Sequence, residues 1–162
     1  ILRLGYRVKK WRQTGIYTTS NRGMNKFKIT SNAINIETNK SIGQDSALGA
    51  RAIFEGVVRN NNEGQEVTKL EYDCYESLAI KEGNLILNEA TKKYALKDVF
   101  CVHRIGSLEI GETAVIVIAA SKHRDEAFKA CRYVIDEVKI RVPIWKKEHY
   151  VDGESGWLKG AG

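Results

Sequence analysis

The sequence predicts an α+β domain with a largely antiparallel sheet and two main helices. Two stretches place apolar residues at the spacing of an amphipathic helix, and several others alternate in polarity or form short apolar runs typical of strands. The expected elements follow one another in the order ββαββα, after an N-terminal edge strand. Because strands cluster in pairs instead of alternating strictly with helices, this order favours an α+β domain over a parallel α/β fold.

Residues 26–75 consist mainly of predicted strands. Residues 26–37 alternate weakly and favour an edge strand. Residues 50–58 are rich in β-branched and aromatic side chains, and residues 66–75 alternate clearly. The segment 59–64, RNNNEG, is rich in turn-forming residues. We therefore expect residues 50–58 and 66–75 to form a hairpin around this turn.

A first helix and two apolar strands follow. Residues 78–94 carry one apolar face at helical spacing, and residues 98–105 and 114–120 are apolar stretches separated by turn glycines. Near the C-terminus, residues 152–156 (DGESG) predict a turn, after which Trp157 packs the tail back onto the domain.

The second helix, over residues 122–141, organises the C-terminal half. Ser121 is the expected N-cap, and Pro143 ends the helix and favours an extended segment over residues 142–149. One apolar face recurs at steps of three and four and consists of Phe128, Cys131, Ile135 and Val138. The strand over residues 114–120 leads directly into this helix.

The net charge of +6 is concentrated at the N-terminus. Residues 1–23 carry six basic side chains and no acidic one, so 20 basic and 20 acidic residues remain from Met24 onward. A basic protein is a candidate for binding nucleic acid, but a neutral domain argues against that partner. We interpret residues 1–23 as a leader translated from vector or upstream sequence, and residues 24–162 as a single domain. A targeting segment and a basic arm for an acidic partner are the alternatives.

Cysteine usage indicates the compartment. Cys74, Cys101 and Cys131 are widely spaced and form no CxxC pair. An odd number without paired spacing favours reduced, mostly buried thiols in a cytoplasmic protein over a disulfide framework or a zinc site. No apolar run reaches the roughly 18 residues that a membrane-spanning helix requires. We therefore expect no metal site and no membrane partner.

The candidate chemistry lies in cationic side chains, because serine-hydrolase, P-loop, zinc-protease and dinucleotide-binding motifs are absent from the sequence. The candidates are Arg59, His123, Arg124, Lys139, Lys146 and Lys147. Arginines and a helix N-terminus suit an anion, and lysines suit charge stabilisation and proton transfer. Taken singly, each is more often a solvated surface charge. A second histidine, His103, is interpreted as a strand-end residue bonded to backbone.

Helix geometry separates two of these candidates. His123 and Lys139 are sixteen residues apart, which on one helix corresponds to about 24 Å. If both side chains serve one small-molecule pocket, we expect a symmetric dimer to bring His123 of one subunit near Lys139 of the other.

Five stretches together carry a family resemblance. They are residues 56–60 (GVVRN), 70–72 (LEY), 103–106 (HRIG), 121–124 (SKHR) and 135–148 (IDEVKIRVPIWKKE). In this order and spacing, over about Leu48 to Trp157, the chain resembles the large, catalytic subunit of molybdopterin synthase. Residues 1–23 have no counterpart in that family. Members often continue beyond the equivalent of Trp157, and Lys159 is the only candidate here for a role of that tail.

The resemblance implies an α/β hammerhead-type fold and a sulfur-transfer reaction. The family's enzyme converts cyclic pyranopterin monophosphate into molybdopterin, with sulfur from the C-terminal thiocarboxylate of a small ubiquitin-like subunit. It implies Lys139 and Lys146 as catalytic lysines. The implied substrate-binding residues are Val57, Val58, Arg59, His123, Arg124, Lys147 and Glu148. The implied assembly is a homodimer of this subunit within a heterotetramer, and no metal or other cofactor is needed.

Two other readings of the cationic residues stay open. The first is a non-catalytic module that binds anions or nucleic acid, for which a steep salt dependence of binding would be the signature. The second is an inactive family member that keeps only the surface for its partner.

Overall fold

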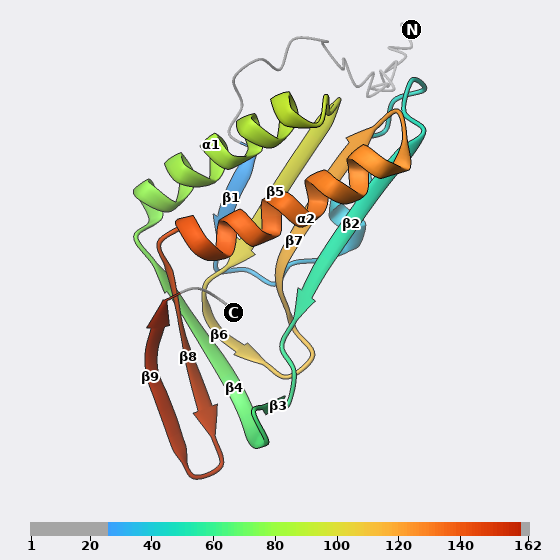
Figure 1. Ribbon diagram of the computed structural model, residues 1–162. Coiled ribbons are helices and arrows are strands. Elements are labelled where there is room, and N and C mark those ends of the chain that lie inside the picture. Colours follow the sequence, from blue (N-terminus) through green and yellow to red (C-terminus); the bar gives the residue numbers. More distant parts are fainter. Residues whose placement is uncertain (1–25, 160–162) are drawn as a thin grey trace, which may run out of the picture.

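The computed structural model describes residues 26–159, which form a sheet covered by two helices and a second sheet that extends away from them (Figure 1). The helices are α1 (Glu76–Lys93) and α2 (Arg124–Arg141), and a short 3-10 helix, η1, spans Ile36–Asn39. The strands are β1 (Phe27–Thr30), β2 (Ala50–Val57), β3 (Asn61–Asn62), β4 (Gln65–Cys74), β5 (Asp98–Arg104), β6 (Gly106–Glu109), β7 (Thr113–Ser121), β8 (Ile144–Tyr150) and β9 (Gly153–Lys159). The predicted α+β class is confirmed.

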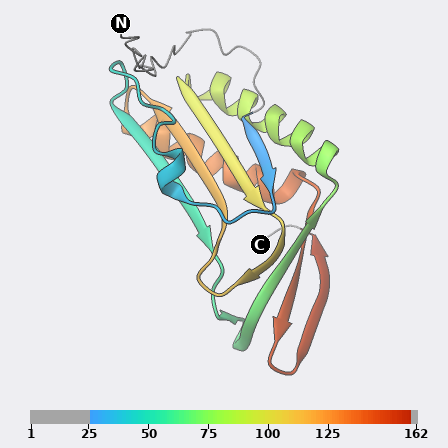
Figure 2. The same ribbon diagram turned by 180° about the vertical axis from the view of Figure 1, so that it is seen from behind.

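The first sheet has the strand order β1-β5-β7-β2, and both helices cover one of its faces (Figure 1). β1 pairs parallel with β5, and the other neighbours pair antiparallel. On the opposite face, which Figure 2 shows, the segment around η1 packs Ile34, Ile36 and Ile42 against a buried cluster that includes Ile116 and Ile118. Because both faces are covered, β7 is apolar along nearly its whole length instead of alternating.

Helix α1 approaches β1 closely at Gly83. A Cβ atom at this position would lie 2.1 Å from Cγ of Phe27, whose ring is among the most buried in the described chain. Only glycine therefore lets the ring lie against the helix backbone. This packing offsets the ~1 kcal/mol by which glycine disfavours a helix interior.

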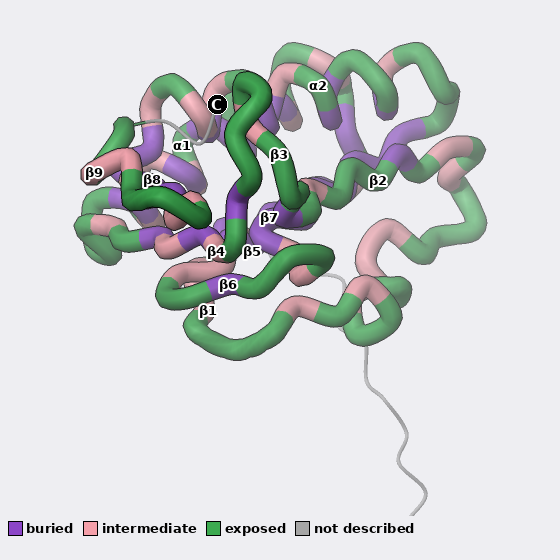
Figure 3. Tube along the Cα trace, turned by 90° about the horizontal axis from the view of Figure 1, so that it is seen from below, coloured by how far each residue is buried: buried purple, intermediate pink, exposed green. Residues whose placement is uncertain are grey.

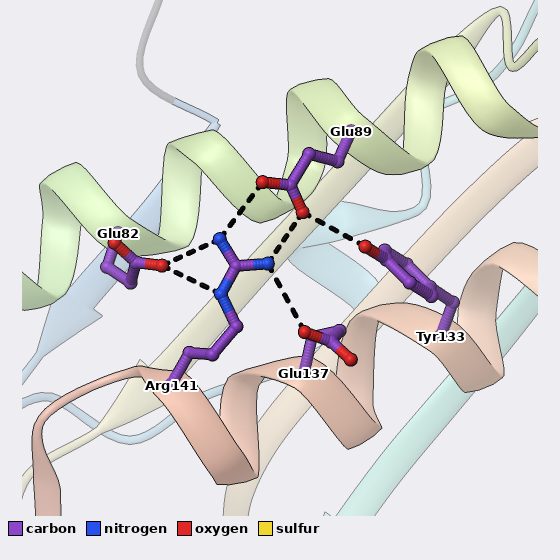
Figure 4. Close-up of polar contacts among 5 residues, drawn as sticks. All are labelled: Glu82, Glu89, Tyr133, Glu137 and Arg141. Atoms are coloured by element: carbon purple, nitrogen blue, oxygen red, sulfur yellow. Dashed lines mark hydrogen bonds and ion pairs between the residues drawn. The ribbon is translucent and has the colours of Figure 1, made fainter.

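Arg141, in the last turn of α2, joins the two helices (Figure 4). Its guanidinium lies 2.7 Å from a carboxylate oxygen of Glu82 and 2.6 Å from one of Glu89, both on α1. Glu137, one turn earlier on α2, completes the group at 3.2 Å, and the hydroxyl of Tyr133 donates to Glu89 at 2.9 Å. The planar fork of arginine suits several carboxylates at once, so this group fixes the C-terminal turn of α2 against α1.

The second sheet has the strand order β3-β4-β8-β9, and β6 pairs with β4 as well. β8 begins directly after Pro143, where the backbone extends as expected, and pairs antiparallel with β4 over most of its length. Seen from below in Figure 3, β6 is mostly exposed and β3 is partly exposed, whereas β7 of the first sheet is buried.

The hairpin predicted between residues 50–58 and 66–75 is wrong. β2 pairs with β7 whereas β4 pairs with β8, so the two strands belong to different sheets. The chain leaves β2 at an irregularity between Gly56 and Val57, and the turn-rich segment forms the smaller hairpin β3–β4. Two strand-like segments around a turn-rich segment favoured the larger hairpin, but pairing of each strand with a distant partner overrode this local pattern.

Two predictions about α2 are also wrong. His123 occupies the N-cap position without a side-chain cap bond, while the hydroxyl of Ser121 donates to the carbonyl of His123. Phe128, expected on the buried face, is 66% exposed. Helical spacing identifies the direction of the apolar face, but it does not show how far the sheet covers that face.

The remaining predictions about local structure have mixed outcomes. Residues 26–37 form a strand only over Phe27–Thr30, and the expected turn and tail near Trp157 form β9. Both helices lie within two residues of their expected bounds. The cysteines are free, with Cys101 and Cys131 buried and Cys74 partly exposed. The leader predicted over residues 1–23 lies outside the described residues.

Candidate functional site

The two sheets and the end of α2 enclose a cavity of about 360 Å³. Five of the nine predicted site residues line it: Val57, Arg59, Lys139, Lys146 and Glu148. Side chains from β2, β3, β4, β5, β7, α2 and β8 contribute to its wall. The cavity therefore lies where segments distant in sequence converge, and it combines cationic groups with an apolar wall, as small-molecule sites commonly do.

Lys146 and Glu148 form a buried ion pair in this cavity. Both belong to β8, two residues apart, so the alternation of a strand places their side chains on the same face. Nζ of Lys146 lies 2.7 Å from Oε1 of Glu148, and the two residues are 8% and 3% exposed. A buried ion pair is stable only when its other hydrogen-bonding atoms are satisfied.

Asn62 of β3 and Tyr150 of β8 satisfy the second oxygen of Glu148. The amide of Asn62 donates to Oε2 at 2.9 Å, and the hydroxyl of Tyr150 donates to the same atom. Burial by itself raises the pKa of the Glu148 carboxyl, but the hydrogen bonds and positive charge of Lys146, with the bonds from Tyr150 and Asn62, outweigh it and lower the pKa below the usual range. The carboxylate is therefore held in its charged form beside Lys146.

Arg59 enters the site from the segment between β2 and β3. The backbone of Val58 is anchored on both sides, because its N–H donates to Glu112 and its carbonyl accepts from Gly111. One residue later, the Nη2 atom of Arg59 donates to Oδ1 of Asn62 at 3.0 Å. The guanidinium itself remains exposed, so it is available to an anion at the cavity.

Tyr72 and His103 form another part of the cavity wall. Their rings meet edge to face with centroids 5.0 Å apart. Burial raises the pKa of Tyr72 to about 12, with a further contribution from the charge of Glu148. Burial also lowers the pKa of His103 to about 4, although the bond from its Nδ1 to the carbonyl of Arg104 at 2.8 Å opposes this shift. Both side chains are therefore neutral near pH 7, and the expected backbone bond of His103 is confirmed.

Lys139 lies on the last turns of α2, at the boundary between the cavity and a neighbouring groove. The groove, about 450 Å³ in volume, runs between α2 and β2. Its apolar wall includes the exposed side chains of Ile53, Phe54 and Phe128. Lys139 thus faces both hollows.

The other four predicted site residues lie elsewhere in the chain. Val58 is buried beside the cavity wall, and Lys147 points to the opposite face of β8, where its Nζ lies 5.0 Å from the centre of the Trp157 ring. His123 and Arg124 lie at the N-terminus of α2, at the opposite end of the helix from Lys139.

The sequence analysis assigned no site role to three residues that line the cavity: Asn62, Tyr72 and His103. Tyr72 and Leu70 share one face of a strand by alternation, which was a usable signal. Nothing local indicates that Asn62 reaches Glu148, since the two are 86 residues apart in the chain. Within residues 26–159, no group of histidine, cysteine and acidic side chains has the arrangement of a metal site, and no helix has the length and apolar composition needed to cross a bilayer.

Comparison with known proteins identifies the family. Residues 29–141 match the MoaE protein family. A molybdopterin synthase catalytic subunit of Pyrococcus abyssi is 45% identical over 126 residues, which cover 78% of this chain and 84% of that protein. The chain belongs to the MoaE family. A second relative of the same name, from Nostoc, is 40% identical over 146 residues, covering 90% of this chain and 88% of the relative.

Two solved structures share the fold of this chain. A molybdopterin synthase from Staphylococcus aureus superposes with a TM-score of 0.78 at 35% identity, covering 84% of this chain and 98% of that chain. A Helicobacter pylori structure, described as a protein–protein complex of subunits 1 and 2 of molybdopterin-converting factor, has a TM-score of 0.66. At 22% identity over 79% of this chain and 87% of that chain, it shows likeness of fold. The expected resemblance is thereby confirmed, and the chain is an enzyme subunit of molybdenum cofactor biosynthesis.

Proposed function

We propose that this chain catalyses the transfer of sulfur from the C-terminal thiocarboxylate of a small ubiquitin-like subunit to cyclic pyranopterin monophosphate, which forms the dithiolene of molybdopterin. The observation that carries this proposal is the convergence of Lys139, the buried Lys146–Glu148 pair and Arg59 on one cavity. Each sulfur forms a bond to a carbon of the substrate, and its bond to the acyl carbon of the carrier is broken by hydrolysis. The carrier leaves with an ordinary carboxylate.

The cations of the cavity suit this chemistry. Negative charge develops on the acyl oxygen during attack at a thioacyl carbon, and fixed ammonium groups stabilise it most strongly where water is excluded. Lys139, at the cavity boundary, is placed to meet the end of an inserted chain, and Lys146 lies deeper, held by Glu148. Arg59 suits the phosphate of the substrate because its guanidinium is exposed and presents a planar fork. Val57 adds apolar wall.

Glu148 has a more specific role in this proposal than lining the site. Its carboxylate is occupied by Lys146, Asn62 and Tyr150, so it is poorly placed to bind a substrate directly. We infer that it holds the Lys146 ammonium in position. Lys147 lies on the opposite face of β8, against Trp157, and Val58 acts through its backbone hydrogen bonds. Both residues support the cavity wall without contacting the substrate.

Two partners belong to the proposal. The small subunit supplies the thiocarboxylate, and the Helicobacter pylori relative is described as a complex of two subunits. A second copy of this chain supplies His123 and Arg124, because these residues lie at the other end of α2 from Lys139, about 24 Å away for sixteen helical residues. The apolar groove beside Lys139, with Phe128 exposed, offers a surface for that copy. The resulting homodimer with two small subunits is a heterotetramer. The three free cysteines of this chain suit a protein of the cytoplasm.

A reconstitution tests this function. The complete chain, a thiocarboxylated small subunit and cyclic pyranopterin monophosphate are combined, and the dithiolene product is measured after oxidation to a fluorescent pterin. We expect product with the wild type and a drop of at least about a hundredfold with Lys139→Ala, since a fixed charge at a reacting centre contributes that much. Lys92→Ala, an exposed lysine on α1, is the control. Absence of product despite a stable complex with the small subunit would leave a binding scaffold.

A further inference from the structure

Asn62 connects Arg59 to Glu148 through its two amide atoms. Its Oδ1 accepts from Nη2 of Arg59 at 3.0 Å, and its Nδ2 donates to Oε2 of Glu148 at 2.9 Å. Glu148 in turn holds Lys146 at 2.7 Å. One continuous chain of contacts therefore runs from the exposed arginine to the buried lysine. Among residues 26–159, no ion pair joins Arg59 to Glu148 directly, so Asn62 carries this connection.

The chemistry of the amide matches its two neighbours. An arginine only donates hydrogen bonds and an ionised carboxylate only accepts them. A side chain that joins the two must accept at one end and donate at the other, which the amides of asparagine and glutamine do. The neighbours also fix the orientation of the Asn62 amide. In the reverse orientation its N–H group would face the donors of Arg59 and its oxygen would face the carboxylate of Glu148.

The backbone holds Asn62 in position. It pairs with Gln65 across a two-residue turn, in which Glu63 and Gly64 both have positive φ values of 49° and 80°. Such a turn matches the twist of the two strands that it joins. The N–H of Val67 then donates to the carbonyl of Asn60 at 2.9 Å, which closes the hairpin on the other side. The side chain of Asn62 is thus presented to the cavity by a short strand whose two residues both pair with β4.

We propose that Asn62 is a positioning residue that holds Arg59 and the Lys146–Glu148 pair in one arrangement across the cavity. This inference rests on the proposed function, because the arrangement matters for a phosphate-bearing substrate whose other end reacts near Lys146. Asn62 acts through Arg59 and Glu148 and takes no part in the chemistry itself. Without Asn62, Arg59 and the Lys146–Glu148 pair would keep their charges, but their positions relative to each other would no longer be fixed.

Several titratable and charged groups surround Glu148. They are Lys146 and Tyr150 on β8, Tyr72 on β4, Arg59 through Asn62, and Lys139 across the cavity, while Glu63 in the β3–β4 turn acts on Tyr150. Of these, Lys146 and Tyr150 also bond the carboxylate, so Asn62 supplies one of three side-chain hydrogen bonds that lower the pKa of Glu148. Loss of the amide donor therefore raises the pKa of Glu148, and an added negative charge raises it further.

Two substitutions separate these effects. Asn62→Asp keeps the size and the acceptor for Arg59, but it removes the donor to Glu148 and adds a like charge. Asn62→Ala removes both bonds without adding charge. We expect the acid limb of the pH profile of kcat/KM to move to higher pH by about one unit in Asn62→Asp and by less in Asn62→Ala. We also expect KM for the substrate to rise in Asn62→Asp, because the new carboxylate competes with the phosphate for Arg59.

Two further variants test the assignment. Tyr150→Phe removes another donor to the same oxygen from a different strand, so the acid limb shifts in the same direction while KM changes less. Gln65→Ala, at the exposed backbone partner of Asn62, changes the hairpin surface alone and keeps the wild-type profile. If Asn62 had a merely structural role, its loss would lower kcat/KM by the same factor at every pH. The proposal would be overturned if the acid limb of the pH profile stayed at the wild-type pH in both Asn62 variants.

A direct measurement keeps this test independent of the reaction. Carboxyl-carbon NMR of the folded protein follows the titration of Glu148 in the wild type and in Asn62→Asp. A higher pKa in the variant is the expected result, and an unchanged one refutes the role of Asn62. A wild type that makes no product refutes the proposed function instead, and the NMR result still decides the contact.

Discussion

Lys146 and Glu148 lie on the same face of β8 as a buried ion pair, with Nζ 2.7 Å from Oε1. The pair lies opposite Tyr72 and Leu70 of β4, which contribute to the same cavity wall. Fixed charge in a site that excludes water interacts strongly with a reacting group. The pairing of β4 with β8 thus sets both the position of Lys146 and the surroundings in which it acts.

Replacement of Glu148 by glutamine removes the charge that faces Lys146. We expect a fall in kcat/KM of more than about tenfold and a loss of about 3 kcal/mol in the free energy of unfolding, because one partner of a buried pair is left without its counter-charge. Urea denaturation and steady-state kinetics measure the two effects. The matched control is Glu154→Gln, whose partner Lys147 lies 3.5 Å away on the outer face. That partly exposed pair should contribute no more than about 1 kcal/mol. Equal effects in both variants would contradict the account.

His103 makes stability depend on pH. Its pKa is about 4 in the folded chain, against an ordinary value of 6.5, so between these values the unfolded chain binds a proton that the folded chain does not. The free energy of unfolding therefore falls as the pH drops from about 7 to 4, by at most about 3 kcal/mol. Urea denaturation across this range measures the slope. His103→Gln removes this contribution, whereas His123→Gln, at an exposed position, retains it. A slope that His103→Gln leaves intact would be evidence against this origin.

Arg141 stabilises the contact between α1 and α2. In Arg141→Lys, a single ammonium replaces a guanidinium that contacts three carboxylates (Figure 4), so the geometry is lost although the charge is kept. We expect a loss of about 1–2 kcal/mol in the free energy of unfolding, measured by urea denaturation. Arg132→Lys, in an exposed pair with Asp136 within α2, is the control and should change stability by less than about 0.5 kcal/mol. Similar losses of stability in both variants would show that the contacts of Arg141 with three carboxylates stabilise the protein no more than a single exposed ion pair does.

Mixed dimers test whether each site uses two subunits. His123→Ala and Lys139→Ala proteins, each inactive alone, are mixed and allowed to exchange subunits. Half of the dimers then contain one intact site, so roughly a quarter of the wild-type activity returns. Mixing Lys139→Ala with Lys146→Ala is the control, because both lysines line the cavity of one chain and each mixed site keeps one defect. No recovery in the first mixture, with exchange verified by mass, would refute the shared site.

Local patterns predicted much of this structure. The apolar spacing located both helices, and the proline located the start of β8. The family motifs pointed to Lys139, Lys146, Glu148 and Arg59, and the structure places these four side chains on one cavity. Such signals succeed because they depend on neighbours within one turn of helix or one strand.

Features that depend on pairing between distant segments could not be predicted. Residues 50–58 and 66–75 each looked like strands, but their partners, β7 and β8, lie some fifty or more residues further along the chain. The same pairing brings Asn62 to Glu148 and Tyr72 beside His103, so these contacts stayed invisible. Neither could sequence show that Phe128 stays outside the core, because exposure depends on how far the sheet extends.

The central claim is that sulfur passes from the partner's thiocarboxylate to the pterin within this cavity. The most direct measurement uses a small subunit whose thiocarboxylate carries a heavy sulfur isotope, in a single turnover with the wild-type chain and with Lys139→Ala. Mass spectrometry follows the label in the pterin and the C-terminus of the small subunit. We predict labelled sulfur in the pterin, with a matching amount of carboxylate on the carrier, and neither with Lys139→Ala. Unlabelled sulfur in the product, or transfer that is as fast in the variant, would contradict the account.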